Sequence, residues 1–199
     1  MSFLLLLALN SAAADAADPG RGCHQLPSNI HVGDDLHAAV TRLLHKSKTF
    51  SAQCAAIAAA NVRVSVVVTL DIRDPLVRAR ATIARFEDGR LLAMIEVPPA
   101  VDYAELLPHE FEHVIEQIEG IDLAALARSG DARIVATGDG AFETARAKAA
   151  GLAAAREFYG EANAALGAAF RGVGRMWRAV CSRSADTVIR IRAGAHKEF

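Results

Sequence analysis

The segment from Leu106 to Gly120 joins an amphipathic helix pattern to two histidines spaced one helical turn apart. Its apolar residues at helical spacing are Phe111, Val114, Ile115 and Ile118. His109, His113 and Glu116 fall on the opposite side of the same helix. Because residues four apart lie one above the other on a helix, both imidazoles can reach a single ion. We expect the apolar side to lie in a core and the histidine side to make a different contact.

The ends of this helix carry their own signals. Asp102 and Glu105 have the spacing of a capping box, and Gly120 suits the left-handed residue after a helix terminus. Pro108 leaves two alternatives. Either the helix begins near Asp102 and is kinked at Pro108, or a short turn leads into a helix that starts with Pro108 in its first turn. Both alternatives keep the histidines one turn apart.

Residues 109 to 113 read H-E-F-E-H, a match to the H-E-x-x-H motif, which indicates a zinc-dependent hydrolase. In that interpretation His109 and His113 bind Zn²⁺, and Glu110 acts as the general base toward a zinc-activated water. Two other interpretations remain open at this point. The histidines can be satisfied core residues, or they can belong to a solvated polar face.

Two histidines leave a catalytic zinc site one protein ligand short, so a further ligand is expected from another element. The stretch Gly138–Gly151 predicts a loop entering an Ala-rich helix that can approach a neighbour closely, with Glu143 in its first turns. Alternative ligands, or groups that orient an imidazole through its other nitrogen, are Glu116, Asp122 and Asp139. Glu143 can also be a surface carboxylate paired with Lys148 or Arg146.

The order H-E-x-x-H, about thirty residues, then a helix-borne glutamate resembles the gluzincin branch of the HExxH zinc metallopeptidases, over roughly residues 60 to 160. The resemblance implies a zincin-like fold in which His109, His113 and Glu143 bind zinc and Glu110 is catalytic. It brings no motif for the group that stabilises the oxyanion. The residues that can be named for that role are Tyr103, Tyr159 and His196.

The pattern of the chain is that of an α+β fold. Helices are expected at Asp34–Lys46 and Phe50–Ala60, and strands at Val62–Leu70, Val77–Phe86 and Leu91–Val97, with a hairpin turn at Asp88-Gly89. These strands predict a small antiparallel sheet packed on the H-E-x-x-H helix and the Ala-rich helix. An edge strand of such a sheet can hold an extended peptide. The arginines of the second strand predict a solvated sheet face, and His24, His31, His37 and His45 predict surface residues.

The N-terminus reads as a secretory signal peptide over residues 1–14, with an apolar run at Phe3–Leu9 followed by small residues. A buried N-terminal segment is the alternative. We therefore expect a secreted or periplasmic protein without a stable membrane span. Cys23 and Cys54 can form a disulfide or remain buried thiols, and Cys181 is left over.

Residues 15–170 predict one domain, followed by a basic tail at 171–199 with seven Lys or Arg against two acidic residues. The tail is expected to contain an amphipathic helix and a frayed end, or to contact a partner. A net charge of −1 favours neither nucleic acid nor a membrane surface as a partner. The resemblance to the metallopeptidases implies a peptide or protein substrate. Alternatives to an exported peptidase are a non-catalytic exported binding protein on the same scaffold, and a structural zinc site closed by His196 or Asp122.

Overall fold

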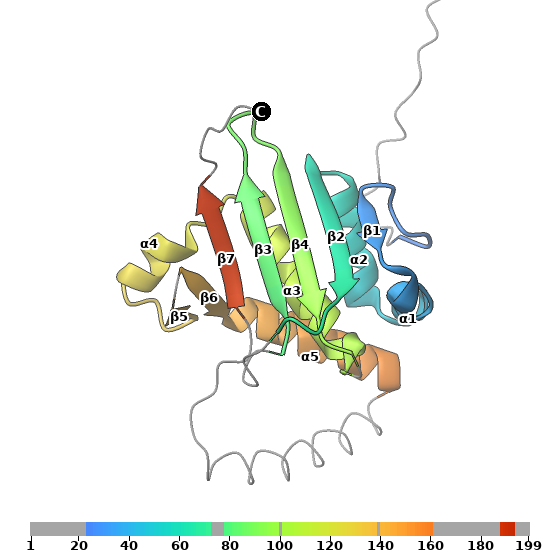
Figure 1. Cartoon of the computed structure of the whole chain (residues 1–199). Coiled ribbons are helices and arrows are strands. Elements are labelled where there is room, and N and C mark those ends of the chain that lie inside the picture. The colour runs from blue at the N-terminus through green and yellow to red at the C-terminus, as the bar shows by residue number, and fades with distance from the viewer. Residues whose placement is uncertain (1–22, 73–77, 100, 139, 161–187, 194–199) are drawn as a thin grey trace, which may run out of the picture.

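The computed structural model describes residues 23–72, 78–99, 101–138, 140–160 and 188–193. In chain order the elements are β1 (Ile30–Val32), α1 (Asp34–Lys46), α2 (Lys48–Ala58), β2 (Val62–Val68), β3 (Arg80–Arg85), β4 (Leu91–Val97), α3 (Tyr103–Ile118), α4 (Leu123–Arg128), β5 (Ile134–Gly138), β6 (Ala141–Thr144), α5 (Ala145–Tyr159) and β7 (Val188–Ala193). A five-stranded sheet stands against helices, with α3 behind it and α5 crossing below (Figure 1). The predicted α+β class is confirmed.

The sheet is mixed, and the prediction of an antiparallel sheet was wrong in this respect. Its strand order is β1-β2-β4-β3-β7. The expected hairpin joins β3 and β4 as an antiparallel pair, with Gly89 of the turn at a φ of 81°. The other three pairings, β1 with β2, β2 with β4 and β3 with β7, are parallel, and β4 lies between β2 and β3. Alternation of side chains tells which face a residue occupies, but it does not tell which strands are neighbours.

The edge strand β7 comes from the segment for which the sequence pattern predicted a tail with an amphipathic helix. Residues Val188–Ala193 instead pair with β3 in parallel, from Arg80↔Val188 to Arg85↔Ala193. The run Val-Ile-Arg-Ile-Arg has the period of two that a strand requires. The remainder of the expected tail and the expected signal peptide lie outside the described residues.

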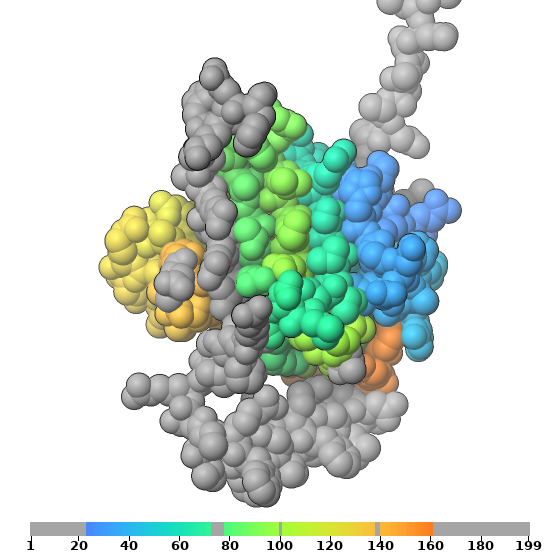
Figure 2. Space-filling model, viewed as in Figure 1, coloured from blue at the N-terminus to red at the C-terminus, as the bar shows by residue number. Residues whose placement is uncertain are grey.

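One face of the sheet is buried against the helices and the other is open. The buried side chains of the central strands are Val62, Val64, Val66, Ala81, Ile83, Leu91, Ala93, Ile95 and Val97. On the opposite face Val67, Leu92 and Met94 are exposed, and the side chains of β2 and β4 are visible there in Figure 2. This alternation is what one covered face requires.

Helix α3 starts at Tyr103 and contains Pro108, so the first of the two alternatives for its beginning is correct. Asp102 caps it by accepting a hydrogen bond from the backbone N–H of Ala104. Glu105 does not complete the expected capping box, because its carboxylate pairs with Arg78 at 3.0 Å. Gly120 follows the helix with a φ of 73°, as predicted. The apolar side contacts α2, where the rings of Phe111 and Phe50 lie 4.8 Å apart between centroids.

Helix α5 packs on the histidine side of α3, and its small residues allow the close approach that the Ala-rich sequence predicted. Gly151 marks the tightest point. A Cβ added there would lie 2.6 Å from the backbone oxygen of Glu105 and 3.2 Å from Cβ of His109. Real Cβ atoms essentially never come this close to a backbone oxygen. The distance between the two helices at His109 therefore depends on a glycine at this position.

Replacing Gly151 with alanine is expected to lower the free energy of unfolding by about 1–3 kcal/mol, because the added methyl group must push two backbones apart. Gly33→Ala is the matched control. Its added Cβ would meet nothing nearer than 3.7 Å, and the φ of Gly33 is −59°, which alanine adopts readily. The control should change stability by less than about 1 kcal/mol. Urea denaturation measures both, and equal effects would contradict the close approach.

The remaining fold predictions have mixed outcomes. Cys23 and Cys54 are free thiols, Cys54 is fully buried, and burial raises the pKa of both.

The arginines of the second strand make intrachain contacts: Arg78 with Glu105, Arg80 with Glu96, and Arg85 with the backbone oxygen of Gln117. The four histidines His24, His31, His37 and His45 are exposed, as predicted. Among the described residues, no helix has the length and apolar character to cross a membrane.

Candidate metal centre

Two elements supply the side chains of the candidate site. His109 and His113 come from α3, as predicted. Glu143 comes from strand β6, where it pairs with Val135 of β5, and not from the following helix. The expectation of a helix-borne Glu143 was wrong because α5 begins one residue later than Thr144, whose hydroxyl accepts a hydrogen bond from the N–H of Ala147.

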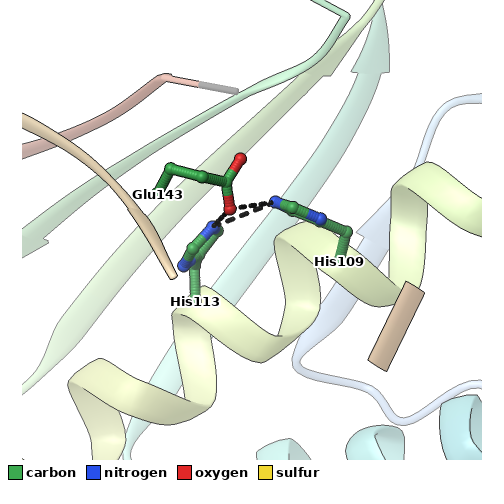
Figure 3. Close-up of side chains that lie close together, drawn as sticks. All are labelled: His109, His113 and Glu143. Atoms are coloured by element: carbon green, nitrogen blue, oxygen red, sulfur yellow. Dashed lines mark hydrogen bonds and ion pairs between the residues drawn. The ribbon is translucent and has the colours of Figure 1, made fainter. Parts of the chain in front are cut away.

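The residues Gly138–Thr144 were expected to be a loop entering a helix, and they belong instead to a short hairpin. The β-branched residues of Ile134–Gly138 and the left-handed Gly140, with a φ of 74°, are the signals that favour this hairpin. A hairpin fixes Glu143 more firmly than a loop does, because its backbone is paired on one side. The side chain then points at α3 (Figure 3).

The three side chains converge on one point. Nε2 of His109 lies 3.2 Å from Nε2 of His113, and Oε1 of Glu143 lies 3.2 Å from the first and 3.9 Å from the second. A tetrahedral zinc site with bonds of 2.0–2.2 Å has ligand–ligand distances of about 3.3–3.6 Å. The observed separations are therefore close to those that three ligands of one ion adopt. The three residues form a group that can hold a metal ion.

Burial separates this arrangement from the two simpler interpretations of the histidines. His109, His113 and Glu143 are 6%, 0% and 3% exposed. This burial excludes a solvated polar face. A satisfied core is also excluded, because Oε2 of Glu143 is buried and has no hydrogen-bond partner. A buried carboxylate oxygen without a partner is costly unless a cation or proton compensates it. The donor set and this orphan oxygen fit a divalent cation.

The charges within the group affect one another. Burial opposes protonation of His109, but the hydrogen bond with Glu143 and the charges of Glu110 and Glu143 outweigh it, so the pKa of His109 is raised. Burial lowers the pKa of His113. Burial opposes ionisation of Glu143, but the contact and charge of His109 and the charge of His113 outweigh it and lower its pKa. The centre therefore favours a carboxylate at Glu143 and a neutral imidazole at His113.

Glu110, the predicted general base, lies next to His109 on α3. Its side chain is completely buried. Its charge is one cause of the raised pKa of His109. The structure thus brings together the three predicted metal ligands, His109, His113 and Glu143, while the predicted role of Glu110 stays a prediction.

The alternative ligands have other contacts. Glu116 lies 2.8 Å from Nδ1 of His113 through Oε2, so it contacts the imidazole at the nitrogen that faces away from the group. Asp122 caps α4 by accepting a hydrogen bond from the N–H of Ala125. Asp139 and His196 lie outside the described residues. Glu143 also does not pair with Arg146, which binds Glu112 and Glu119 instead.

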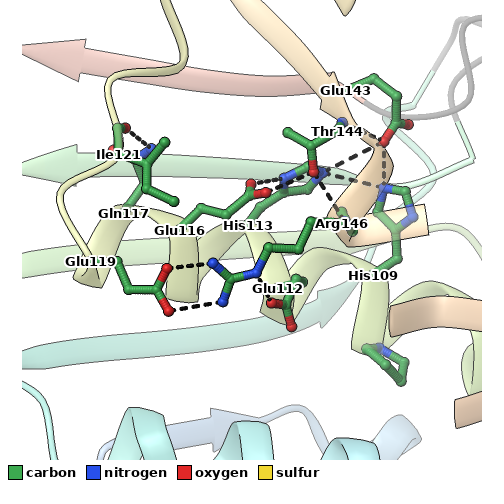
Figure 4. A network of polar contacts seen from close by, with 12 residues as sticks. His109, Glu112, His113, Glu116, Gln117, Glu119, Ile121, Glu143, Thr144 and Arg146 are labelled. Atoms are coloured by element: carbon green, nitrogen blue, oxygen red, sulfur yellow. Dashed lines mark hydrogen bonds and ion pairs between the residues drawn. The ribbon is translucent and has the colours of Figure 1, made fainter. Parts of the chain in front are cut away.

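A polar network around the centre was not foreseen from the sequence (Figure 4). Arg146 of α5 makes ion pairs with Glu112 and Glu119 of α3. Glu112 also accepts a hydrogen bond from Gln53 of α2 at 2.6 Å. The network joins three helices on the side of α3 that carries the histidines. One sequence signal could have indicated this network. Glutamates near the C-terminal, negative end of the α3 dipole are unfavourable unless cations from other elements pair with them.

Tyr103 and Tyr159, the two tyrosines named for stabilising the oxyanion, form hydrogen bonds away from the His109/His113/Glu143 group. The hydroxyl of Tyr159 donates to Asp102 at 2.9 Å, and that of Tyr103 lies 3.4 Å from the backbone oxygen of Pro98. Both contacts are at the N-terminal end of α3. The oxyanion-stabilising group is therefore not identified among the described residues.

No protein-family model, no curated protein and no solved structure matches this chain. The assignment of the site consequently rests on its geometry. That geometry shows a buried His109/His113/Glu143 group consistent with an H-E-x-x-H motif completed by a glutamate, and capable of holding a metal ion.

Proposed function

We propose that this protein is a zinc-dependent hydrolase that cleaves peptide bonds, similar to the HExxH metallopeptidases. The observation that carries the proposal is the buried group of His109, His113 and Glu143, in which an H-E-x-x-H pair is joined by a glutamate from another element. Among the described residues, no fourth His, Cys, Asp or Glu joins His109, His113 and Glu143. Three protein ligands leave one coordination position for water or substrate, which is the pattern of catalytic zinc sites, whereas structural sites use four.

The choice of metal follows from the ligand atoms. Two imidazole nitrogens and one carboxylate oxygen suit Zn²⁺ better than Ca²⁺ or Mg²⁺, which prefer oxygen ligands alone. A bound zinc ion would polarise a peptide carbonyl and lower the pKa of water. Glu110 is then the residue placed to accept a proton from the attacking water and to deliver it to the departing amine. His109, His113 and Glu143 hold their positions through packing of α3, α5 and β6.

The site of action in this proposal is outside the cytoplasm, in the periplasm or the medium. The support is the apolar run Phe3–Leu9 with small residues after it. The substrate is an extended peptide or protein segment. The near-neutral net charge gives no reason to propose nucleic acid as a partner.

The burial of the candidate metal centre favours a second candidate function. His113 and Glu110 are not exposed at all, and a cavity of about 250 Å³ lies elsewhere, lined among others by Arg42, Tyr103 and Phe158. A closed metal group suits a protein that uses its ion for stability and binds partners through another surface. The exposed Leu92 and Met94 on the open sheet face are candidates for that surface.

The two functions separate in one experiment. The protein is stripped with a chelator, divided, and one half is reloaded with one equivalent of zinc. Both halves are incubated with a peptide library, and products are identified by mass spectrometry. A hydrolase gives new termini only in the zinc-loaded half. Cleavage by neither half, at full zinc occupancy, would reject the hydrolase and leave the non-catalytic metal protein.

A further inference from the structure

The carboxylate of Glu116 contacts a candidate metal ligand and the element that carries another. Its Oε2 lies 2.8 Å from Nδ1 of His113, and its Oε1 accepts a hydrogen bond from the hydroxyl of Thr144 at 2.7 Å. Thr144 follows Glu143 directly and caps α5. The three side chains are buried, with exposures of 0% to 3%. Glu116 therefore joins the histidine helix to the junction of β6 and α5 (Figure 4).

The direction of the Thr144 hydrogen bond is fixed, and the contact of Glu116 with His113 depends on which ring nitrogen carries the proton. The Thr144 oxygen accepts from the N–H of Ala147, so its own proton points to Glu116. A carboxylate oxygen that accepts a hydrogen bond from the ring requires the proton on Nδ1 of His113. A neutral imidazole protonated at Nδ1 keeps the lone pair on Nε2. That is the nitrogen of His113 that faces His109 and Glu143.

From these contacts we infer that Glu116 is a positioning residue of the metal centre, which holds His113 in its metal-binding tautomer and, through Thr144, sets the place of Glu143. This role rests on the proposed metal site but not on hydrolysis. Glu116 is not one of the three residues that could hold the ion. It acts on two ligands at once, because one of its oxygens orients His113 and the other fixes the residue next to Glu143.

The network offers matched variants for a test. Glu116→Gln keeps the size of the side chain but cannot accept both hydrogen bonds. Thr144→Val removes the hydroxyl at constant shape, and Thr144→Ser restores it. Glu119→Gln is the control, since Glu119 lies one turn further on the same helix, pairs with Arg146 and makes no contact with His113 in the described structure. Circular dichroism first establishes that each variant is folded.

Zinc affinity is measured by competition with a chromophoric chelator, and the His113 tautomer by ¹⁵N NMR of the metal-free protein. Glu116→Gln is expected to bind zinc about 10- to 100-fold more weakly and to lose the single Nδ1–H form. Thr144→Val should weaken binding while keeping the tautomer, and Thr144→Ser should recover wild-type affinity. Glu119→Gln should match wild type in both readouts.

The outcomes are distinguishable from failure of the hydrolase proposal, because neither readout uses turnover. Wild-type zinc affinity in folded Glu116→Gln would overturn the inference, as would an unchanged tautomer. If Glu116→Gln does not fold, the Thr144 pair decides: equal affinities of the valine and serine variants would overturn the link to Glu143. If wild type binds no zinc, the tautomer in the metal-free protein still tests the contact with His113.

Discussion

Glu143→Ala, purified without added metal, is expected to contain far less zinc than the wild-type protein, which should carry close to one zinc per chain. The variant loses the one oxygen ligand of the group and leaves two imidazoles 3.2 Å apart between their Nε2 atoms. A two-ligand site binds much more weakly than one in which three side chains are already in place. Removal of a direct ligand should cost more than the roughly 10- to 100-fold typical of a supporting residue.

The measurement is elemental analysis of both proteins purified side by side, with Glu119→Ala as the matched control. Glu119 is a half-exposed glutamate whose partner is Arg146, so its loss leaves the three ligands in place. Equal zinc in wild type and Glu143→Ala would contradict the ligand set. Zinc in neither would show that the H-E-x-x-H match is fortuitous or vestigial, and the binding-protein function would then take precedence.

The histidine pair could be predicted because its information is local. The spacing of His109 and His113, the apolar positions on the other side of α3 and the signals at Asp102 and Gly120 all lie within twenty residues of one another. Helical geometry converts these spacings directly into positions. Local patterns also gave the hairpin of β3 and β4, since its two strands are adjacent in the sequence.

Glu143 was identified as a ligand candidate but was placed in the wrong element. The alanines after it dominate the local pattern and favour helix, while the strand that ends at Thr144 has only four residues. Thr144 is a good cap residue, and its presence could have set the helix boundary one residue after Glu143. Glu143 still lies beside the histidines, because β6 ends next to α3 and places Oε1 of Glu143 3.2 Å from Nε2 of His109.

The sheet order and the contact of Glu116 with Thr144 could not be predicted, for a shared physical reason. The parallel pairing of β2 with β4, and of β3 with β7, depends on which distant segments meet in the folded chain. The contact of Glu116 with His113 follows from their spacing on one helix and was among the alternatives, but the second contact of Glu116 forms only when Thr144, 28 residues away in the sequence, lies beside it. A glutamate near the C-terminal end of an isolated helix is mildly unfavourable. The presence of Glu116 at that place is therefore explained by its tertiary contacts.

Glu110→Gln is expected to abolish most peptide hydrolysis while the zinc content stays that of wild type. Glutamine has nearly the shape of glutamate, but its amide cannot accept and return a proton, and loss of a general base typically costs about 10²- to 10⁴-fold in rate. Because His109, His113 and Glu143 are unchanged, the metal should remain.

The measurement is the rate at which each protein cleaves the library peptide that wild type cleaves fastest. Wild type, Glu110→Gln and Glu119→Gln are compared at equal zinc occupancy. Glu119 lies nine residues further along the chain, near the C-terminal end of α3, and its variant should retain the wild-type rate. A Glu110→Gln protein that cleaves as fast as wild type would remove Glu110 from the mechanism. Since Glu110 is fully buried, a substrate can reach it only by displacing the groups that cover it.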